Sequence, residues 1–157
     1  MLTTAVPATK EVDFSIKAED WSRYQVHDGT IIRVRVVVRK IIRTIDVGPQ
    51  GYPDITLENI NAVSAIVPDH LKKAPSTQPF DPKKDIGEEM KFEPMEEKWQ
   101  EYHTTDGFKV LVKPSLMKVF RYLKYNVFGE PIYQVNVQSL INLERLPRSS
   151  ITETLGK

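Results

Sequence analysis

Apolar and polar residues alternate along one stretch of the chain. Between residues 31 and 43 most even positions hold valine or isoleucine, whereas several odd positions hold arginine. A period of two is typical of a strand that buries one face and exposes the other. About 15 such residues would span more than about 45 Å as one straight strand. We therefore expect a bend or bulge, and Lys40, on the apolar parity, marks its place.

The same pattern returns later in the chain, at the spacing that separates Trp21 from Trp99, and Lys118 again lies on the apolar parity. Twelve identities, both tryptophans among them, fall in one order without a gap at this spacing. In the first copy they are Glu11, Phe14, Glu19, Trp21, Tyr24, Asp28, Gly29, Val34, Lys40, Arg43, Gly51 and Pro53. A fixed period of this kind indicates an internal repeat. It predicts two modules, residues 11–68 and 89–147.

Turn residues divide each module into short elements. Asp28-Gly29 and Asp106-Gly107 favour tight turns, because glycine adopts positive φ without steric cost. The remaining expected elements are strands at 12–16, 55–58, 62–67, 133–138 and 140–143, and a short helical turn or an irregular segment at 18–24 and again at 95–102. This pattern predicts an all-β protein made of two tandem small curled sheets or β-barrels. Each resembles an SH3 or Sm barrel in general shape only, and the halves should pack together because such small modules are marginal alone.

Proline and polar residues mark the other segments. Residues 69–88 contain three prolines and many charges, which is typical of a linker. Residues 1–10 and 148–157 have no periodic apolar face, so we expect both ends to be flexible.

Composition excludes several kinds of chemistry. The chain has no cysteine, which rules out disulfides, thiolate metal sites and a thiol nucleophile. It has no signal-peptide pattern and no long apolar run, so we expect a cytoplasmic protein without a membrane partner. Lys and Arg number 22 against 21 Asp and Glu, so only local charge can point to a partner.

The strongest functional candidates are the basic residues of the two alternating stretches. They are Arg33, Arg35, Arg39, Arg43, Lys109, Lys113, Lys118, Arg121 and Lys124. A basic sheet face binds nucleic acid or an acidic protein surface, although it can also be a solvated face that guards an aggregation-prone strand. The second module offers fewer acidic neighbours on its return strand, so we expect its basic surface to be less neutralised.

Catalytic patterns are missing from the sequence. His27, His70 and His103 are not spaced as metal ligands, and no phosphate-binding glycine loop or nucleophile elbow occurs. We therefore predict a non-catalytic binding or assembly module with no cofactor and no metal. The alternatives are a structural subunit of a larger assembly and an enzyme with a cleft between the two repeats.

Overall fold

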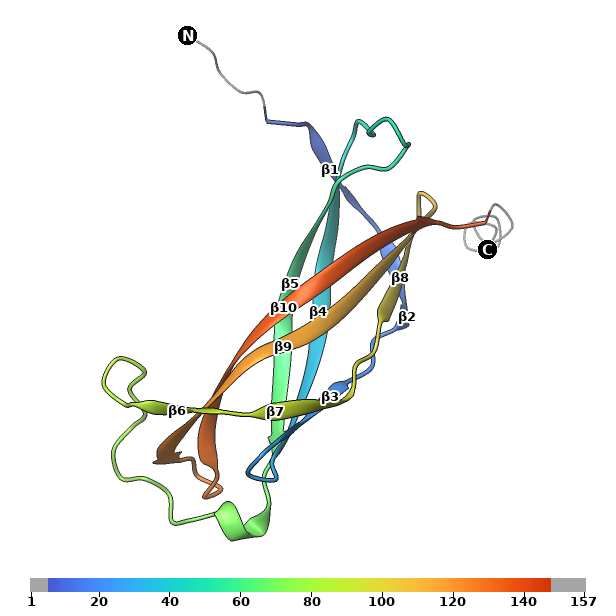
Figure 1. Ribbon diagram of the computed structural model, residues 1–157. Helices are drawn as coiled ribbons and strands as arrows, with labels where there is room; N and C mark the ends of the chain where they lie inside the picture. Colours follow the sequence, from blue (N-terminus) through green and yellow to red (C-terminus); the bar gives the residue numbers. More distant parts are fainter. Residues whose placement is uncertain (1–5, 148–157) are drawn as a thin grey trace.

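The computed structural model describes residues 6–147, which form two five-stranded antiparallel sheets (Figure 1). Sheet A contains β1 (Thr9–Val12), β3 (Ser22–Val26), β4 (Ile31–Thr44), β5 (Ile55–Ile66) and β7 (Phe92–Glu96). Sheet B contains β2 (Phe14–Ala18), β6 (Gly87–Met90), β8 (Gln100–Thr104), β9 (Phe108–Tyr125) and β10 (Pro131–Arg145). A 3₁₀ turn, η1 (Asp69–Leu71), follows β5. The all-β prediction is confirmed, but the sheets are open and do not close into barrels.

Each sheet is built around one long strand. In sheet A, β4 pairs with β5 along one side and with β3 and β1 on the other, and β7 extends the sheet beyond β3. In sheet B, β9 pairs with β10 on one side and with β8 and β6 on the other, and β2 extends the sheet beyond β8. β5 and β10 are therefore edge strands.

The two halves of the chain exchange a strand. β1 and β2 are separated only by Asp13, yet they belong to different sheets, and the same is true of β6 and β7 on either side of Lys91. Backbone hydrogen bonds fix both crossings: the Thr105 N–H donates to the Asp13 carbonyl at 2.9 Å, and the His27 N–H donates to the Lys91 carbonyl at 2.9 Å. As a result, each sheet takes four strands from one half and one from the other.

The strand positions repeat at the spacing seen in the sequence. β6, β7 and β8 occupy the positions in the second copy that β1, β2 and β3 occupy in the first, with the same bounds. The bulges repeat too, because the pairing register shifts around Arg39 in β4 and around Met117 in β9. These positions adjoin Lys40 and Lys118, so the predicted irregularity is confirmed in both long strands.

Inward-facing side chains of both sheets form two hydrophobic clusters. One holds Tyr24, Val26, Ile32, Val34, Leu116 and Val119, and the other holds Val36, Val38, Ile41, Tyr102, Val110 and Val112. Each cluster is closed by one edge-to-face aromatic pair, Tyr24 with Phe92 and Phe14 with Tyr102. Two carboxylates accept the tyrosine hydroxyl hydrogens, Glu97 from Tyr24 at 2.6 Å and Glu19 from Tyr102 at 2.9 Å. Since both sheets contribute to each cluster, they form one packed two-layer unit.

Several local predictions were wrong. The segments expected to be helical turns or irregular structure contain strands β3 and β8 instead, because Ser22, Tyr24 and Val26 are buried in the core and alternate with less buried neighbours. The separate strands expected within 55–67 and 133–143 are continuous in β5 and β10.

The ends and the linker also carry structure. β1 begins at Thr9, inside the segment expected to be flexible, whereas residues 1–5 and 148–157 lie outside the described residues. In the linker, Phe80 packs edge-on against Tyr122, with ring centroids 4.8 Å apart. Within residues 6–147 no helix is long and apolar enough to cross a membrane.

Candidate functional site

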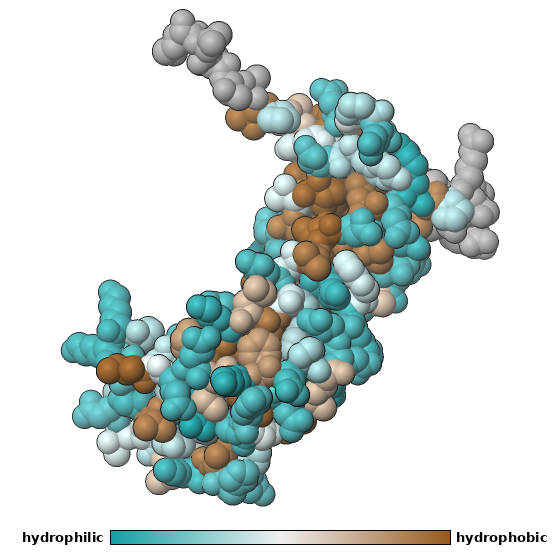
Figure 2. All heavy atoms as spheres, in the orientation of Figure 1, coloured by the Kyte–Doolittle hydropathy of each residue, from teal (hydrophilic) through white to brown (hydrophobic). Residues whose placement is uncertain are grey.

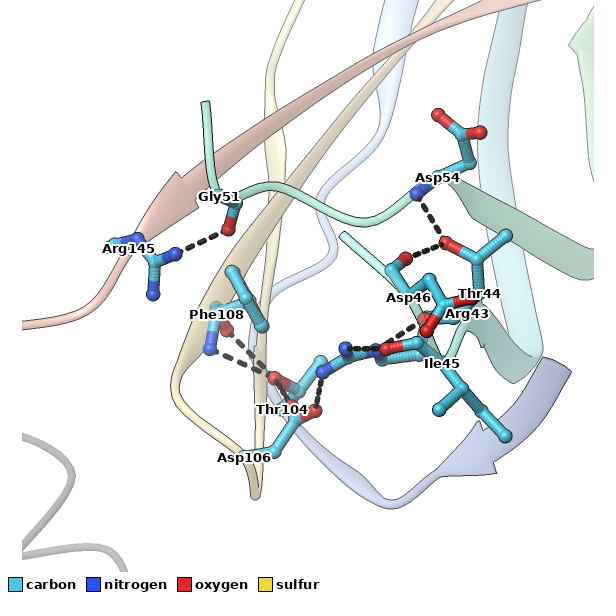
Figure 3. A network of polar contacts seen from close by, with 10 residues as sticks. All are labelled: Arg43, Thr44, Ile45, Asp46, Gly51, Asp54, Thr104, Asp106, Phe108 and Arg145. Atoms are coloured by element: carbon cyan, nitrogen blue, oxygen red, sulfur yellow. Dashed lines mark hydrogen bonds and ion pairs between the residues drawn. The ribbon is translucent and has the colours of Figure 1, made fainter. Parts of the chain in front are cut away.

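The bulge divides the predicted basic row of β4 between the two faces of sheet A. Arg33 and Arg35 precede it and point outward, whereas Arg43 follows it on the parity of buried Ile41. One extra residue reverses the alternation of every later side chain. Arg43 therefore turns toward sheet B, where its Nη1 lies 2.6 Å from Oδ2 of Asp106 (Figure 3).

Arg121 of β9, in sheet B, makes the corresponding contact with the turn between β3 and β4 of sheet A. Its Nη1 lies 3.1 Å from Oδ2 of Asp28, and its Nη2 lies 3.3 Å from Oε1 of Glu88. Arg43 and Arg121 thus hold the two sheets together at opposite ends of the molecule. Neither guanidinium belongs to an outward basic row.

Asp28 is the most enclosed carboxylate of these contacts. Its side chain is 5% exposed, and it accepts hydrogen bonds from the Tyr133 hydroxyl at 2.6 Å and from the Thr30 N–H at 2.9 Å. Burial alone would raise the pKa of Asp28, but these hydrogen bonds and the charge of Arg121 outweigh it and lower the pKa below its ordinary value. Asp28 is therefore an ionised structural group at neutral pH.

Four of the other basic candidates are already engaged. Arg39 lies 3.3 Å from Glu58, Lys109 lies 3.8 Å from Glu144, and Lys124 lies 3.5 Å from Asp85. Lys113 stacks on the ring of Trp99, its Nζ 5.2 Å from the ring centroid. Lys118 is exposed beside the β9 bulge and forms no ion pair with residues 6–147.

The second module is consequently not the less neutralised one. Its Lys109, Arg121 and Lys124 all lie within ion-pair distance of a carboxylate. Asp28 reaches Arg121 only because the halves interleave, and Asp85 reaches Lys124 from the linker. Because Asp28 belongs to the other repeat and Asp85 to the linker, the charge balance of the second repeat alone does not include these carboxylates.

A cluster of cations without ion-pair partners among the described residues lies on the outward face of sheet A. The guanidinium carbons of Arg33 and Arg35 lie 4.6 and 4.8 Å from the ring centroid of Trp21. Arg23 of β3 is the direct cross-strand partner of Arg33. We call this surface, formed by Trp21, Arg23, Arg33 and Arg35, the arginine face.

No carboxylate of residues 6–147 forms an ion pair with the three arginines of the arginine face. The Nη2 of Arg33 donates to the Ser64 hydroxyl at 3.1 Å, but the Nε atoms of Arg33 and Arg35 are buried without a partner. Like charges directly across a strand pair are destabilising. On its other side Arg23 faces Glu96 of β7, so part of its charge is balanced, whereas Arg33 and Arg35 have no acidic cross-strand partner in the described strands.

The corresponding surface of sheet B lacks this character. The repeat aligns Arg23, Arg33 and Arg35 with Glu101, Leu111 and Lys113 of the second copy. Because the sheets pack face to face, their outward surfaces lie on opposite sides of the molecule, and the two basic rows do not join. The arginine face is thus a feature of sheet A alone.

Arg23 was not among the sequence candidates. Its signal was present, because Ser22, Tyr24 and Val26 alternate with Arg23 and Gln25 on one strand. The expectation of a helical turn or an irregular segment at 18–24 concealed it.

Metal-ligating side chains do not gather in the described part of the chain. His103 is engaged with Glu101 at 2.6 Å, and no group of three potential ligands among His, Cys, Asp and Glu is placed to hold a metal ion in residues 6–147. Comparison with known proteins adds no assignment, since no protein-family model, curated protein or solved structure matches the chain.

Proposed function

We propose that the protein is a non-catalytic binding module that docks an acidic protein partner on the arginine face. The observation that carries the proposal is that Arg33 and Arg35 lie over Trp21, with Arg23 across the strand pair from Arg33, and that none of the three forms an ion pair with a carboxylate of residues 6–147. A guanidinium group binds a carboxylate through two parallel hydrogen bonds. Arg23, Arg33 and Arg35 together offer several such donors on a rigid sheet.

Apolar neighbours favour a protein over a nucleic acid as the partner. On the same outward face, β5 places Ile66 and Ile60 on either side of the arginine row, and they are 46% and 55% exposed. Ala62, which has a short side chain, is the cross-strand partner of Arg35 on β5. Tryptophan and arginine beside apolar residues are typical of the energetic centre of protein interfaces.

The indole of Trp21 supports the same choice. Both guanidinium groups lie over its ring, so the arginines occupy the surface on which a nucleobase would stack. Trp21 therefore acts as a support that orients Arg33 and Arg35.

Binding of a labelled peptide that alternates glutamate with leucine, followed by fluorescence anisotropy, tests the proposal. Arg35→Glu should weaken binding at least about tenfold, as loss of an interface arginine commonly does. Lys118→Glu, a matched charge reversal on the opposite sheet, should change affinity less than about twofold because exposed charges on the far side are screened. Circular dichroism would show that both variants keep the wild-type fold.

Two outcomes would overturn the proposal. One is equal loss of peptide binding in Arg35→Glu and Lys118→Glu, which would indicate attraction to net charge without a site. The other is a single-stranded oligonucleotide that binds more tightly than the peptide and loses affinity with Arg35→Glu, which would assign the arginine face to nucleic acid.

A further inference from the structure

β10 leaves one long edge of sheet B without a partner strand. Across residues 6–147 it pairs only with β9. Natural edge strands are usually guarded by charged side chains, proline or short length. β10 spans 15 residues, and none from Ile132 to Leu143 is charged. Such an edge is suited to adding another strand.

The middle of this edge is open to solvent. Residues 138–142 are all exposed, and Leu140 on the outward side is 54% exposed. Ile141 points toward the inside of the sandwich, yet it is 45% exposed, so β5 does not cover it. Figure 2 shows apolar atoms on the surface in the upper half of the molecule, where Figure 1 draws β10 crossing β4 and β5.

The pairing with β9 fixes which backbone groups are free. The Leu146 N–H donates to the Gly107 carbonyl at 2.9 Å, which makes these two residues a hydrogen-bonded pair. Such pairs alternate along an antiparallel ladder. Glu144, Asn142, Leu140 and Gln138 therefore bond to β9, whereas the odd-numbered residues between them aim N–H and C=O at solvent.

We propose that β10 pairs with β10 of a second copy of this chain, antiparallel, about a two-fold axis at Gln138. The residue numbers of each facing pair then sum to 276. This register places Tyr133 opposite Leu143, Val135 opposite Ile141, Val137 opposite Ser139, Gln134 opposite Asn142, Asn136 opposite Leu140 and Gln138 opposite itself. The result is a continuous sheet across two chains.

The pattern of side chains is compatible with this occupant and this register. On the inward side, Val135 meets Ile141 and Tyr133 meets Leu143, so apolar side chains face one another. On the outward side, Gln134 meets Asn142 and Gln138 meets Gln138, so amides face amides at these pairs, whereas Asn136 meets Leu140. No two charges of equal sign face each other across the two strands. The odd-numbered residues from 133 to 143 of the two chains together form about twelve main-chain hydrogen bonds between the β10 strands.

β5 is less suited to the same role. It is shorter, 12 residues against 15. It also carries Glu58, which is held by Arg39 beside the bulge. A charged pair next to an edge is one of the devices that protect strands from association.

Light scattering tests the association directly. The wild-type chain should approach twice its monomer mass of 18.0 kDa as concentration rises. Ser139→Pro removes an N–H aimed at the second chain without touching the bonds to β9, so it should return the mass to that of a monomer. Ser139→Ala keeps this N–H and should remain dimeric.

Disulfide cross-linking tests the register, because the chain has no cysteine of its own. In Gln138→Cys the two thiols form a non-hydrogen-bonded pair with Cα atoms about 4.5 Å apart, which suits a disulfide. Oxidation should therefore yield a covalent dimer. In Asn136→Cys the two residues are four positions apart along the ladder, about 13 Å, and should not cross-link.

The proposal is overturned if the wild-type chain stays monomeric at about 100 μM, a concentration at which a complex with micromolar Kd would form. It is equally overturned if the Gln138→Cys variant dimerises but does not cross-link on oxidation, since another surface would then join the chains. These readouts do not involve the arginine face, so the proposed function and this interface can fail independently.

Discussion

Removal of the Asp28 carboxylate should destabilise the protein more than removal of its counterpart Asp106. Asp28→Ala deletes an acceptor that serves three donors: Tyr133, Thr30 and Arg121. A hydrogen bond to a charged group contributes about 1.5–3 kcal/mol, and a buried donor left unpaired costs about 1–3 kcal/mol. In the variant, Arg121 still forms its ion pair with Glu88. The Tyr133 hydroxyl still shares a hydrogen bond with the Thr30 hydroxyl. We therefore expect a loss of about 3–4 kcal/mol.

Asp106→Ala provides the matched comparison at the corresponding position. Asp106 is 26% exposed, and within residues 6–147 it accepts two hydrogen bonds, from Arg43 and Thr104. Arg43 still donates to the carbonyl groups of Thr44 and Ile45. The cost should be about 1–2 kcal/mol, because solvent replaces part of what is lost.

Chemical unfolding followed by fluorescence of the two tryptophans measures both values. Because the pKa of Asp28 is lowered from 3.8 in the folded state, its contribution is fully present above that value and disappears as pH falls through the folded pKa. The stability gap between wild type and Asp28→Ala should therefore narrow in acid. Equal losses in the two alanine variants, or a gap that does not change with pH, would refute the reasoning.

Two further substitutions test the turns and the core. Gly129→Ala should destabilise the protein by more than about 1 kcal/mol, since the φ of Gly129 is +77° and the new Cβ would clash with the Lys73 carbonyl. Gly48→Ala should be tolerated, because its Cβ would lie at an ordinary van der Waals distance, 3.7 Å, from the Tyr52 carbonyl. Unfolding midpoints in denaturant compare the two. Tyr24→Phe should cost about 1–2 kcal/mol by removing the hydrogen bond to Glu97. Burial and that hydrogen bond raise the pKa of Tyr24 above 10.0, so ultraviolet titration should show a wild-type phenol that stays neutral while the protein is folded.

The sequence was most informative where short-range physics decides the structure. Alternation predicted the buried positions of β4, such as Val34 and Val36, and an off-pattern lysine predicted its bulge. Both depend on which way neighbouring side chains point, which a single strand already determines. The tight turns at Gly29 and Gly107 were likewise predictable, because both adopt positive φ.

Long-range pairing was outside the reach of the same reasoning. The pattern through Val12, Phe14 and Ile16 reads as one strand, but the chain crosses between sheets at Asp13. Nothing local distinguishes the two outcomes, because the apolar alternation is the same in both, and in the structure Ile16 is 54% exposed. Arg43 was assigned to the wrong face for a related reason: the bulge was expected, but its effect on later residues was not carried through.

The exchange of β2 and β7 has a consequence for how such a molecule can assemble. A chain ending before the linker would keep its long strand but lack the neighbour that β7 supplies to β3. Two such half-length chains could supply each other's missing strands only by bimolecular association, at a rate set by their concentration. Tethering them through residues 69–88 makes that encounter internal, at an effective concentration in the millimolar range for short flexible tethers. Cleavage of the tether after folding should therefore leave the two fragments associated non-covalently through the exchanged strands.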